Sequence, residues 1–236
     1  DKRHFWSTSS VTQYGSEVQV DGDLSADAKR DLAVVASQVK AGGNVELDAG
    51  RDVSLLAAAN ESSSEYRYKG NGKKINKEDS VVRQQAAVIE AGGDLDVNAG
   101  SNLVLSASQL KADGETYLYA GEQLALLAAQ NSDYHLYDYK KKGSFGSNKT
   151  QRDETTTVRN GGSSVEAGGD ITLVSEGDQL YQRARLESGG DLTLESGGAI
   201  TFEGVKDLDQ ESHEKSKNSW AWTSAKGKGK TDETLL

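Results

Sequence analysis

The residues that could support catalysis in this chain are carboxylates in closely spaced pairs. Glu46 and Asp48, and likewise Asp94 and Asp96, lie two residues apart, which places both members of a pair on one face of a strand. Two carboxylates that flank a sugar can act as the acid and the base of a glycoside hydrolase. The alternative, solvated outward faces on an acidic protein, is favoured here. A carbohydrate-active enzyme stays a minor alternative, and we expect no enzymatic activity.

Histidine and glycine residues do not indicate a reactive site either. His4, His135 and His213 have no Ser, Cys or metal ligand as a partner at a recognisable spacing. The Gly-Gly-Asp corners lack the nonapeptide of calcium β-rolls, and they form neither a P-loop nor a dinucleotide fingerprint. The sequence therefore predicts no catalytic residue, no cofactor and no metal site.

A second kind of chemistry, aromatic residues beside lysines, recurs in three inserts at about residues 61–87, 132–160 and 205–231. A partial fourth insert lies at residues 1–14. Each of the three holds six Lys or Arg against four Asp or Glu, a charge of +2, so −10 − 6 leaves −16 for the remainder. The candidate interaction residues are Tyr66, Tyr68, Lys73, Lys74, Tyr137, Tyr139, Lys141, Lys142, Phe145, Trp220, Trp222, Lys226 and Lys228.

Two interpretations of these aromatic residues stay open. Alternating Tyr side chains on a hairpin pack against their cross-strand neighbours and stabilise the hairpin itself. Tyr and Trp beside Lys are also typical of protein hot spots and of membrane interfaces. The same chemistry placed three times along one chain supports an interaction surface, and the two interpretations are compatible.

The elements that position these residues follow from an internal repeat. Residues 53–69 (VSLLAAANESSSEYRYK) return 71 residues later as residues 124–140 (LALLAAQNSDYHLYDYK). A shorter period of about 21 residues lies inside the long one, with alternating apolar pairs such as Val45 and Leu47. Such alternation is the signature of strands with one buried face, and Gly-Gly-Asn or Gly-Gly-Asp steps supply tight corners between them.

Strands this short cannot form useful hairpins, but they can wind as coils that stack on one another. We therefore predict an all-β chain: a right-handed parallel β-helix, a solenoid of about 21 residues per coil and roughly six or seven turns, with projecting β-hairpin inserts. Residues 1–236 would form this single β-helical repeat domain. The tip Asn71-Gly72 is a strong hairpin signal. A β-sandwich or a propeller would need longer strands and hairpin signals every 8–12 residues or so.

Composition excludes several other classes of protein. The chain of 236 residues has no Cys, which excludes a disulfide scaffold and a thiolate metal site. A net charge of −10 disfavours nucleic-acid binding, and no apolar run approaches the ~20 residues of a membrane helix. The lack of an initiator Met and of a signal peptide predicts a fragment of a longer chain. Exposed coil ends predict end-to-end self-association.

The repeated Ala-Gly-Gly-Asp-Leu unit, seen at residues 91–95, resembles a filamentous-haemagglutinin repeat. The inserts, with KKGSFGSNKT at residues 141–150 and HEKSKNSW at residues 213–220, carry the likeness further. They resemble those of the second haemagglutinin-repeat region of contact-dependent growth inhibition exoproteins. The resemblance covers about residues 16–231.

This resemblance implies a secreted, cell-surface protein of a Gram-negative bacterium, exported by an outer-membrane partner in two-partner secretion. Members of the family carry a toxic C-terminal domain to neighbouring cells, and the resemblance implies that this region helps the toxin across the target outer membrane. The implied role is a non-enzymatic stalk. Its partners would be a component of the target-cell envelope, other domains of the same exoprotein and the secretion partner. A passive adhesin spacer is the alternative.

Overall fold

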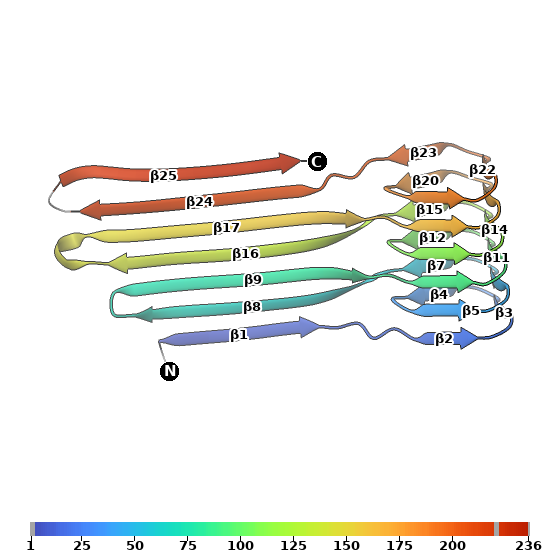
Figure 1. Ribbon diagram of the computed structural model, residues 1–236, viewed down its shortest axis with the longest axis horizontal. Helices are drawn as coiled ribbons and strands as arrows, with labels where there is room; N and C mark the ends of the chain where they lie inside the picture. The colour runs from blue at the N-terminus through green and yellow to red at the C-terminus, as the bar shows by residue number, and fades with distance from the viewer. Residues whose placement is uncertain (1–2, 220–221, 236) are drawn as a thin grey trace.

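The computed structural model describes residues 3–219 and 222–235. Its elements are β-strands apart from one short 3-10 turn, η1 (Ser144–Gly146). Figure 1 shows two parts, a stack of short strands at one end and a set of long strands that leave the stack side by side. Within the described residues, no helix is long and apolar enough to cross a membrane.

The stack consists of three parallel sheets of six strands each. The first contains β2 (Glu17–Val20), β5 (Gln38–Ala41), β10 (Val88–Ala91), β13 (Gln109–Ala112), β18 (Ser164–Ala167) and β21 (Arg185–Ser188). The second contains β3 (Leu24–Ala28), β6 (Val45–Ala49), β11 (Leu95–Ala99), β14 (Thr116–Ala120), β19 (Ile171–Ser175) and β22 (Leu192–Ser196). The third contains β4 (Leu32–Val35), β7 (Val53–Leu56), β12 (Leu103–Ser106), β15 (Leu124–Leu127), β20 (Gln179–Gln182) and β23 (Ile200–Glu203).

Consecutive strands within each coil of the stack belong to different sheets, which is the arrangement of a parallel β-helix. Each coil contributes one strand to each sheet, and its partners come from the coils above and below. Val45 thus lies between Leu24 of the preceding coil and Leu95 of the following one. The all-β class and the parallel sheets predicted from the alternation are confirmed. The right-handed sense of the coil stays a prediction.

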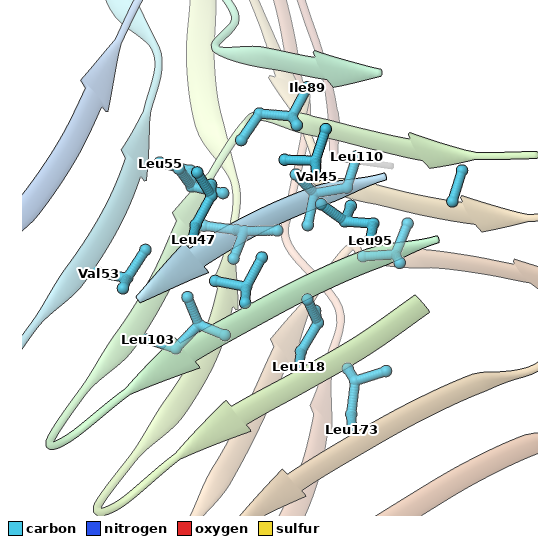
Figure 2. Packing of buried hydrophobic residues seen from close by; sticks show 14 of the residues in the cluster. Val45, Leu47, Val53, Leu55, Ile89, Leu95, Leu103, Leu110, Leu118 and Leu173 are labelled. Atoms are coloured by element: carbon cyan, nitrogen blue, oxygen red, sulfur yellow. The ribbon is translucent and has the colours of Figure 1, made fainter. Parts of the chain in front are cut away.

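The core runs through the middle of the stack as layers of inward-facing Val, Leu and Ile (Figure 2). Val45, Leu95 and Leu103 are fully buried. Glu46 and Asp96, which alternate with these apolar residues, face outward, so a shift of the register by one residue would bury carboxylates. The apolar pattern therefore fixes how each coil sits on the next.

Seven long strands form one antiparallel sheet, which we call the hairpin sheet. In sheet order they are β1 (His4–Val11), β8 (Ala58–Gly70), β9 (Lys73–Gln85), β16 (Ala129–Lys142), β17 (Asn148–Gly161), β24 (Leu208–Ser219) and β25 (Trp222–Leu235). β8 has 13 residues, so at ~3.3 Å per residue it reaches roughly 40 Å from the stack. We predicted β-hairpin inserts that project from the stack, and the structure shows in addition that the hairpins pair with one another along their edges.

The spacing of the coils explains this edge-to-edge pairing. An insert leaves the chain after every second coil, following β7, β15 and β23. Two coils rise about 9.6 Å at ~4.8 Å per coil, and two paired strands have the same width. Since each hairpin supplies two strands, hairpins that leave every second coil meet without a gap. The long repeat is thus the unit that continues the stack and the hairpin sheet together.

Side-chain hydrogen bonds hold the base of each hairpin to its neighbour. The backbone N–H of Gln84 donates a hydrogen bond of 2.7 Å to Asn131 Oδ1. At the next junction between hairpins, the backbone N–H of Asn160 donates a hydrogen bond of 2.8 Å to Asp207 Oδ1. These contacts recur with the long repeat, so successive hairpins are held to their neighbours in the same way.

Both ends of the stack expose apolar side chains. Val18 in the first coil is 41% exposed, and Leu192 and Phe202 in the last coil are 46% and 67% exposed. The equivalent positions of the inner coils are covered by the next coil. The ends are therefore open edges of the kind that pair with other strands, and end-to-end association of copies stays a prediction.

Candidate functional site

The hairpin sheet gathers aromatic residues from separate inserts on one face. Opposed residues of an antiparallel pair share a face, and so do residues two apart along a strand. Trp6, Tyr66, Lys77 and Tyr137 form one such row across β1, β8, β9 and β16. The next row towards the tip contains His4, Tyr68, Ile75 and Tyr139. We call this side the aromatic face and define it by His4, Trp6, Tyr66, Tyr68, Tyr137 and Tyr139.

The tyrosines of the aromatic face contact one another and their neighbours. The rings of Tyr137 and Tyr139 lie nearly parallel, at 5°, with centroids 6.5 Å apart. Lys77 Nζ lies 5.6 Å from the centre of the Tyr137 ring, within the range of a cation–π contact. The four tyrosines are half-buried, whereas Trp6 is 71% exposed. Packing within the sheet and exposure to a partner therefore coexist on this face.

Two histidine–aspartate pairs bridge different inserts on the same face. His135 Nδ1 lies 2.5 Å from Asp79 Oδ1, and His213 Nδ1 lies 2.9 Å from Asp153 Oδ1. The hydrogen bond to Asp153 raises the pKa of His213 above its ordinary value. Hydrogen bonds from Gln151 and then from His213 lower the pKa of Asp153. The sequence missed these pairs because the partners lie in different inserts.

We expect the His213–Asp153 pair to make the hairpin sheet more stable at mildly acidic pH. Because the folded-state pKa of His213 is raised, its contribution is complete below the unfolded value of about 6.5 and is lost as the pH rises through the folded value. Titration of the imidazole by NMR should give a midpoint above ~6.5 that falls in Asp153→Asn. An unchanged midpoint in that variant would contradict the pairing. The His213→Gln variant lacks this imidazole, so the NMR signal that it loses is that of His213.

The opposite face of the hairpin sheet has internal contacts of its own. The guanidinium of Arg67 lies 5.7 Å from the centre of the Phe5 ring. Tyr134 donates a hydrogen bond of 3.1 Å to Glu154, which also pairs with Arg152 at 2.8 Å. These groups satisfy one another within the hairpin sheet.

Lysines line up across the tip of the hairpin sheet. Lys141 of β16 lies opposite both Lys73 of β9 and Lys149 of β17. The register continues to Lys217 of β24, and we call these residues the lysine row: Lys73, Lys141, Lys149 and Lys217. The backbone of Lys226 in β25 lies opposite that of Lys217. The lysine row shares the aromatic face, two residues beyond Tyr68 and Tyr139. Lys74 and Lys142, one residue along, point to the other side.

The remaining candidate interaction residues from the sequence lie partly or wholly outside the residues that the structure describes. Trp220 lies outside the described residues. The backbones of Trp222, Lys226 and Lys228 belong to β25, but their side chains, and that of Phe145 in η1, are outside the described part of the chain.

The carboxylates that could suggest catalysis lie on the outer face of the stack. Glu46 in β6 lies opposite Asp96 in β11, and Asp48 accepts a hydrogen bond of 3.0 Å from Asn98. Partial burial, followed by the charges of Asp94 and Asp48, raises the pKa of Asp96. Over the described residues, no group of three His, Cys, Asp or Glu side chains is placed to hold a metal ion.

The same unit of sequence is matched three times by one protein-family model. The model, described as a hemagglutinin repeat, matches residues 1–76, 68–151 and 142–234. The chain belongs to the hemagglutinin repeat family. Each match begins in one insert and ends in the next, so a hemagglutinin repeat here is a pair of coils with the long strands on either side. No curated protein and no solved structure matches the chain.

Membership of the hemagglutinin repeat family defines the general class of this protein. Hemagglutinin repeats are structural and adhesive rather than enzymatic. They are typical of secreted or surface-exposed exoproteins of Gram-negative bacteria. The predicted resemblance to filamentous-haemagglutinin repeats is confirmed at this level.

Proposed function

We propose that this chain is a segment of a non-enzymatic stalk in a two-partner-secreted surface exoprotein of the contact-dependent growth inhibition type. Its hairpin sheet contacts the outer membrane or another envelope component of a target cell and takes part in the delivery of a C-terminal toxin. The stack joins the hairpin sheet to the other domains of the exoprotein. An outer-membrane secretion partner exports the chain unfolded, a route that a chain without Cys suits.

The aromatic face is the observation that supports this proposal. Residues of β1, β8 and β16, which are far apart in sequence, supply one Trp and four Tyr to one side of a sheet that reaches roughly 40 Å from the stack. Aromatic residues beside cations are enriched at protein hot spots and at membrane interfaces. A spacer alone would not need this chemistry on one face.

A passive adhesin spacer is the second candidate, and the half-buried tyrosines favour it. In that case the rings of Tyr137 and Tyr139 only stiffen the hairpin sheet through their stacking. Recognition would then belong to other domains of the exoprotein.

Binding of the purified chain to intact Gram-negative cells and to outer-membrane vesicles separates the two functions. The test variant changes Tyr66, Tyr68, Tyr137 and Tyr139 to Thr, a residue that suits β-strands. The matched control changes Phe5 and Tyr134, which point to the opposite face, to Thr. Both variants are first checked for an unfolding midpoint close to that of the parent chain.

We expect binding to fall tenfold or more in the aromatic-face variant, which corresponds to at least about 1.4 kcal/mol, and to persist in the control. Equal binding by all three proteins, or no binding by the parent chain, would reject the hairpin sheet as the contact surface and leave the spacer.

A further inference from the structure

A groove of about 690 Å³ lies at the tip of the hairpin sheet, and we call it the tip groove. Four of its lysines lie on the face opposite to the lysine row. Lys69 of β8, Lys74 of β9 and Lys140 of β16 are directly opposed, and Lys142 follows two residues along β16. On β17 and β24 the same face continues with neutral polar residues, namely Asn148, Thr150, Ser216 and Asn218. The tip groove thus has a cationic half and a neutral half.

The cationic half of the tip groove holds charges that the chain itself leaves without counter-ions. Lys140 Nζ lies 3.2 Å from Asp138 Oδ2. In the described part of the chain, Lys69, Lys74 and Lys142 have no carboxylate at ion-pair distance, and no Asp or Glu lines the groove. Like charges in opposed positions destabilise a sheet. An acidic partner would therefore stabilise this end of the hairpin sheet.

A surface of the stack carries charges of the opposite sign. Four outward-facing carboxylates lie on the neighbouring strands β3, β6 and β11, and we call them the acidic patch: Asp27, Glu46, Asp48 and Asp96. Glu46 lies opposite Asp96, and Asp48 lies opposite Asp27. Over the residues that the structure describes, none of the four has a Lys or Arg at ion-pair distance. A basic partner would relieve the repulsion between them.

The tip groove and the acidic patch lie at opposite ends of the molecule. Figure 1 shows β3 and β11 on the side of the stack that is farthest from the tips of the hairpins. The long strands hold the tip roughly 40 Å from the stack, so one molecule does not bring its own two surfaces together. Two molecules can do so, and each then keeps one of its two surfaces free.

The two surfaces match in spacing and in the order of their side chains. Both are faces of β-sheets, so their charges repeat at the same ~4.8 Å from strand to strand. The three acidic strands are followed by β14, where Tyr117 is 38% exposed, and then by β19, where Thr172 faces outward. The three lysine strands are likewise followed by the neutral β17 and β24. Opposed faces therefore place ammonium groups against carboxylates and neutral groups against neutral groups.

We infer that the partner of the tip groove is a second copy of this chain, whose acidic patch docks there. The contact is head to tail, so further copies can add to it. It differs from association through the open ends of the stack, which would bury apolar side chains. It also goes beyond the proposed function, because the aromatic face stays free for a target cell.

The size of the contact predicts how strong it is. Five strands at ~4.8 Å span about 19 Å, and a patch of this width and ~10 Å of strand length is well below the ~800 Å² per partner of a standard interface. We therefore expect a weak association that depends on protein concentration and on salt.

The test is sedimentation equilibrium of the full chain at concentrations up to about 1 mM, at low and at high salt. The tip variant removes three lysines of the groove: Lys69→Gln, Lys74→Gln and Lys142→Gln. The patch variant removes three carboxylates: Asp27→Asn, Glu46→Gln and Asp96→Asn. The control makes the same change in charge at the tip but on the aromatic face: Lys141→Gln, Lys149→Gln and Lys217→Gln. Each variant is first checked for an unfolding midpoint close to that of the parent chain.

We expect the parent chain and the control to associate at low salt and to dissociate at high salt. The tip variant and the patch variant should each associate at least tenfold more weakly. An equimolar mixture of these two variants should form dimers and nothing larger, because the mixture keeps one intact tip groove and one intact acidic patch per pair.

Three results would overturn the inference. The first is a parent chain that stays monomeric at every concentration and both salt concentrations. The second is association that the tip and patch variants leave unchanged, which would assign it to the open ends of the stack. The third is an equal loss in the control, or a mixture that stays monomeric, which would assign the association to net charge rather than to these two surfaces.

Discussion

Replacing Leu105 by Ala should lower the free energy of unfolding by about 2–5 kcal/mol. Leu105 is fully buried in β12, between Leu55 of the coil before it and Leu126 of the coil after it. Both neighbours are themselves fully buried and held by the parallel ladders, so the cavity cannot close by a local shift. Unfolding in urea, followed by circular dichroism, measures the loss.

Leu127→Ala is the matched control for this substitution. It removes the same atoms from β15, but Leu127 is only half-buried and lies on the other side of the strand from the core. We expect a clearly smaller loss in this variant. Equal losses in the two variants would show that the inward rows of the stack are not its main source of stability.

Replacing Gly93 by Ala should lower the free energy of unfolding by about 0.5–1.5 kcal/mol, for a reason that concerns side chains rather than backbone strain. A Cβ at this position would lie 2.0 Å from Asn44 Oδ1. That oxygen accepts a hydrogen bond of 2.9 Å from the amide of Asp94 in the next coil. The new methyl group would displace the Asn44 side chain and leave this amide without its partner.

Gly22→Ala tests whether the cost at Gly93 comes from this contact. Gly22 occupies the equivalent corner of the first coil, where a Cβ would meet nothing within 4 Å. Without a neighbour to displace, the substitution should be neutral or stabilise the chain by up to ~1 kcal/mol, because Ala restricts the unfolded chain. If Gly93→Ala lowers the free energy of unfolding no more than Gly22→Ala does, the displacement of the Asn44 side chain is not the cause. Both values come from the same urea titration.

Much of the stack could be predicted from the sequence, because its signals are local. Alternation of apolar residues, as at Val45 and Leu47, identifies short strands with a buried face, and the glycine corners separate them. Recurrence of this pattern identifies the stacking. The corner bonds between Asx side chains and the next coil, such as Asn44 to Asp94, could not be predicted, since each one depends on the coil above.

The residue types of the candidate site could be predicted from the sequence, but the way in which the strands bring them together could not. The positive φ of both Asn71 and Gly72 fits a type I′ turn, which places Gly70 opposite Lys73 and so fixes which residues of β8 and β9 share a face. That register could have been counted along the sequence, and it would have separated Lys73 from Lys74. The pairing between β9 and β16 could not be predicted from the sequence, because it depends on the rise of two coils matching the width of two strands.

The aromatic face and the lysine row exist only if inserts that are distant in sequence pair along their edges. Disulfide cross-linking measures this directly, because the chain has no cysteine of its own. Thr156 of β17 lies opposite Gln210 of β24, on the same side of the hairpin sheet. Thr156→Cys with Gln210→Cys is the test pair, and Thr156→Cys with Glu211→Cys is the control, since Glu211 points to the other side.

We predict that mild oxidation of the monomeric test pair gives an intramolecular disulfide, seen by mass spectrometry, while the control pair stays reduced. No disulfide in the test pair, or equal formation in both pairs, would mean that the inserts stand apart as separate hairpins.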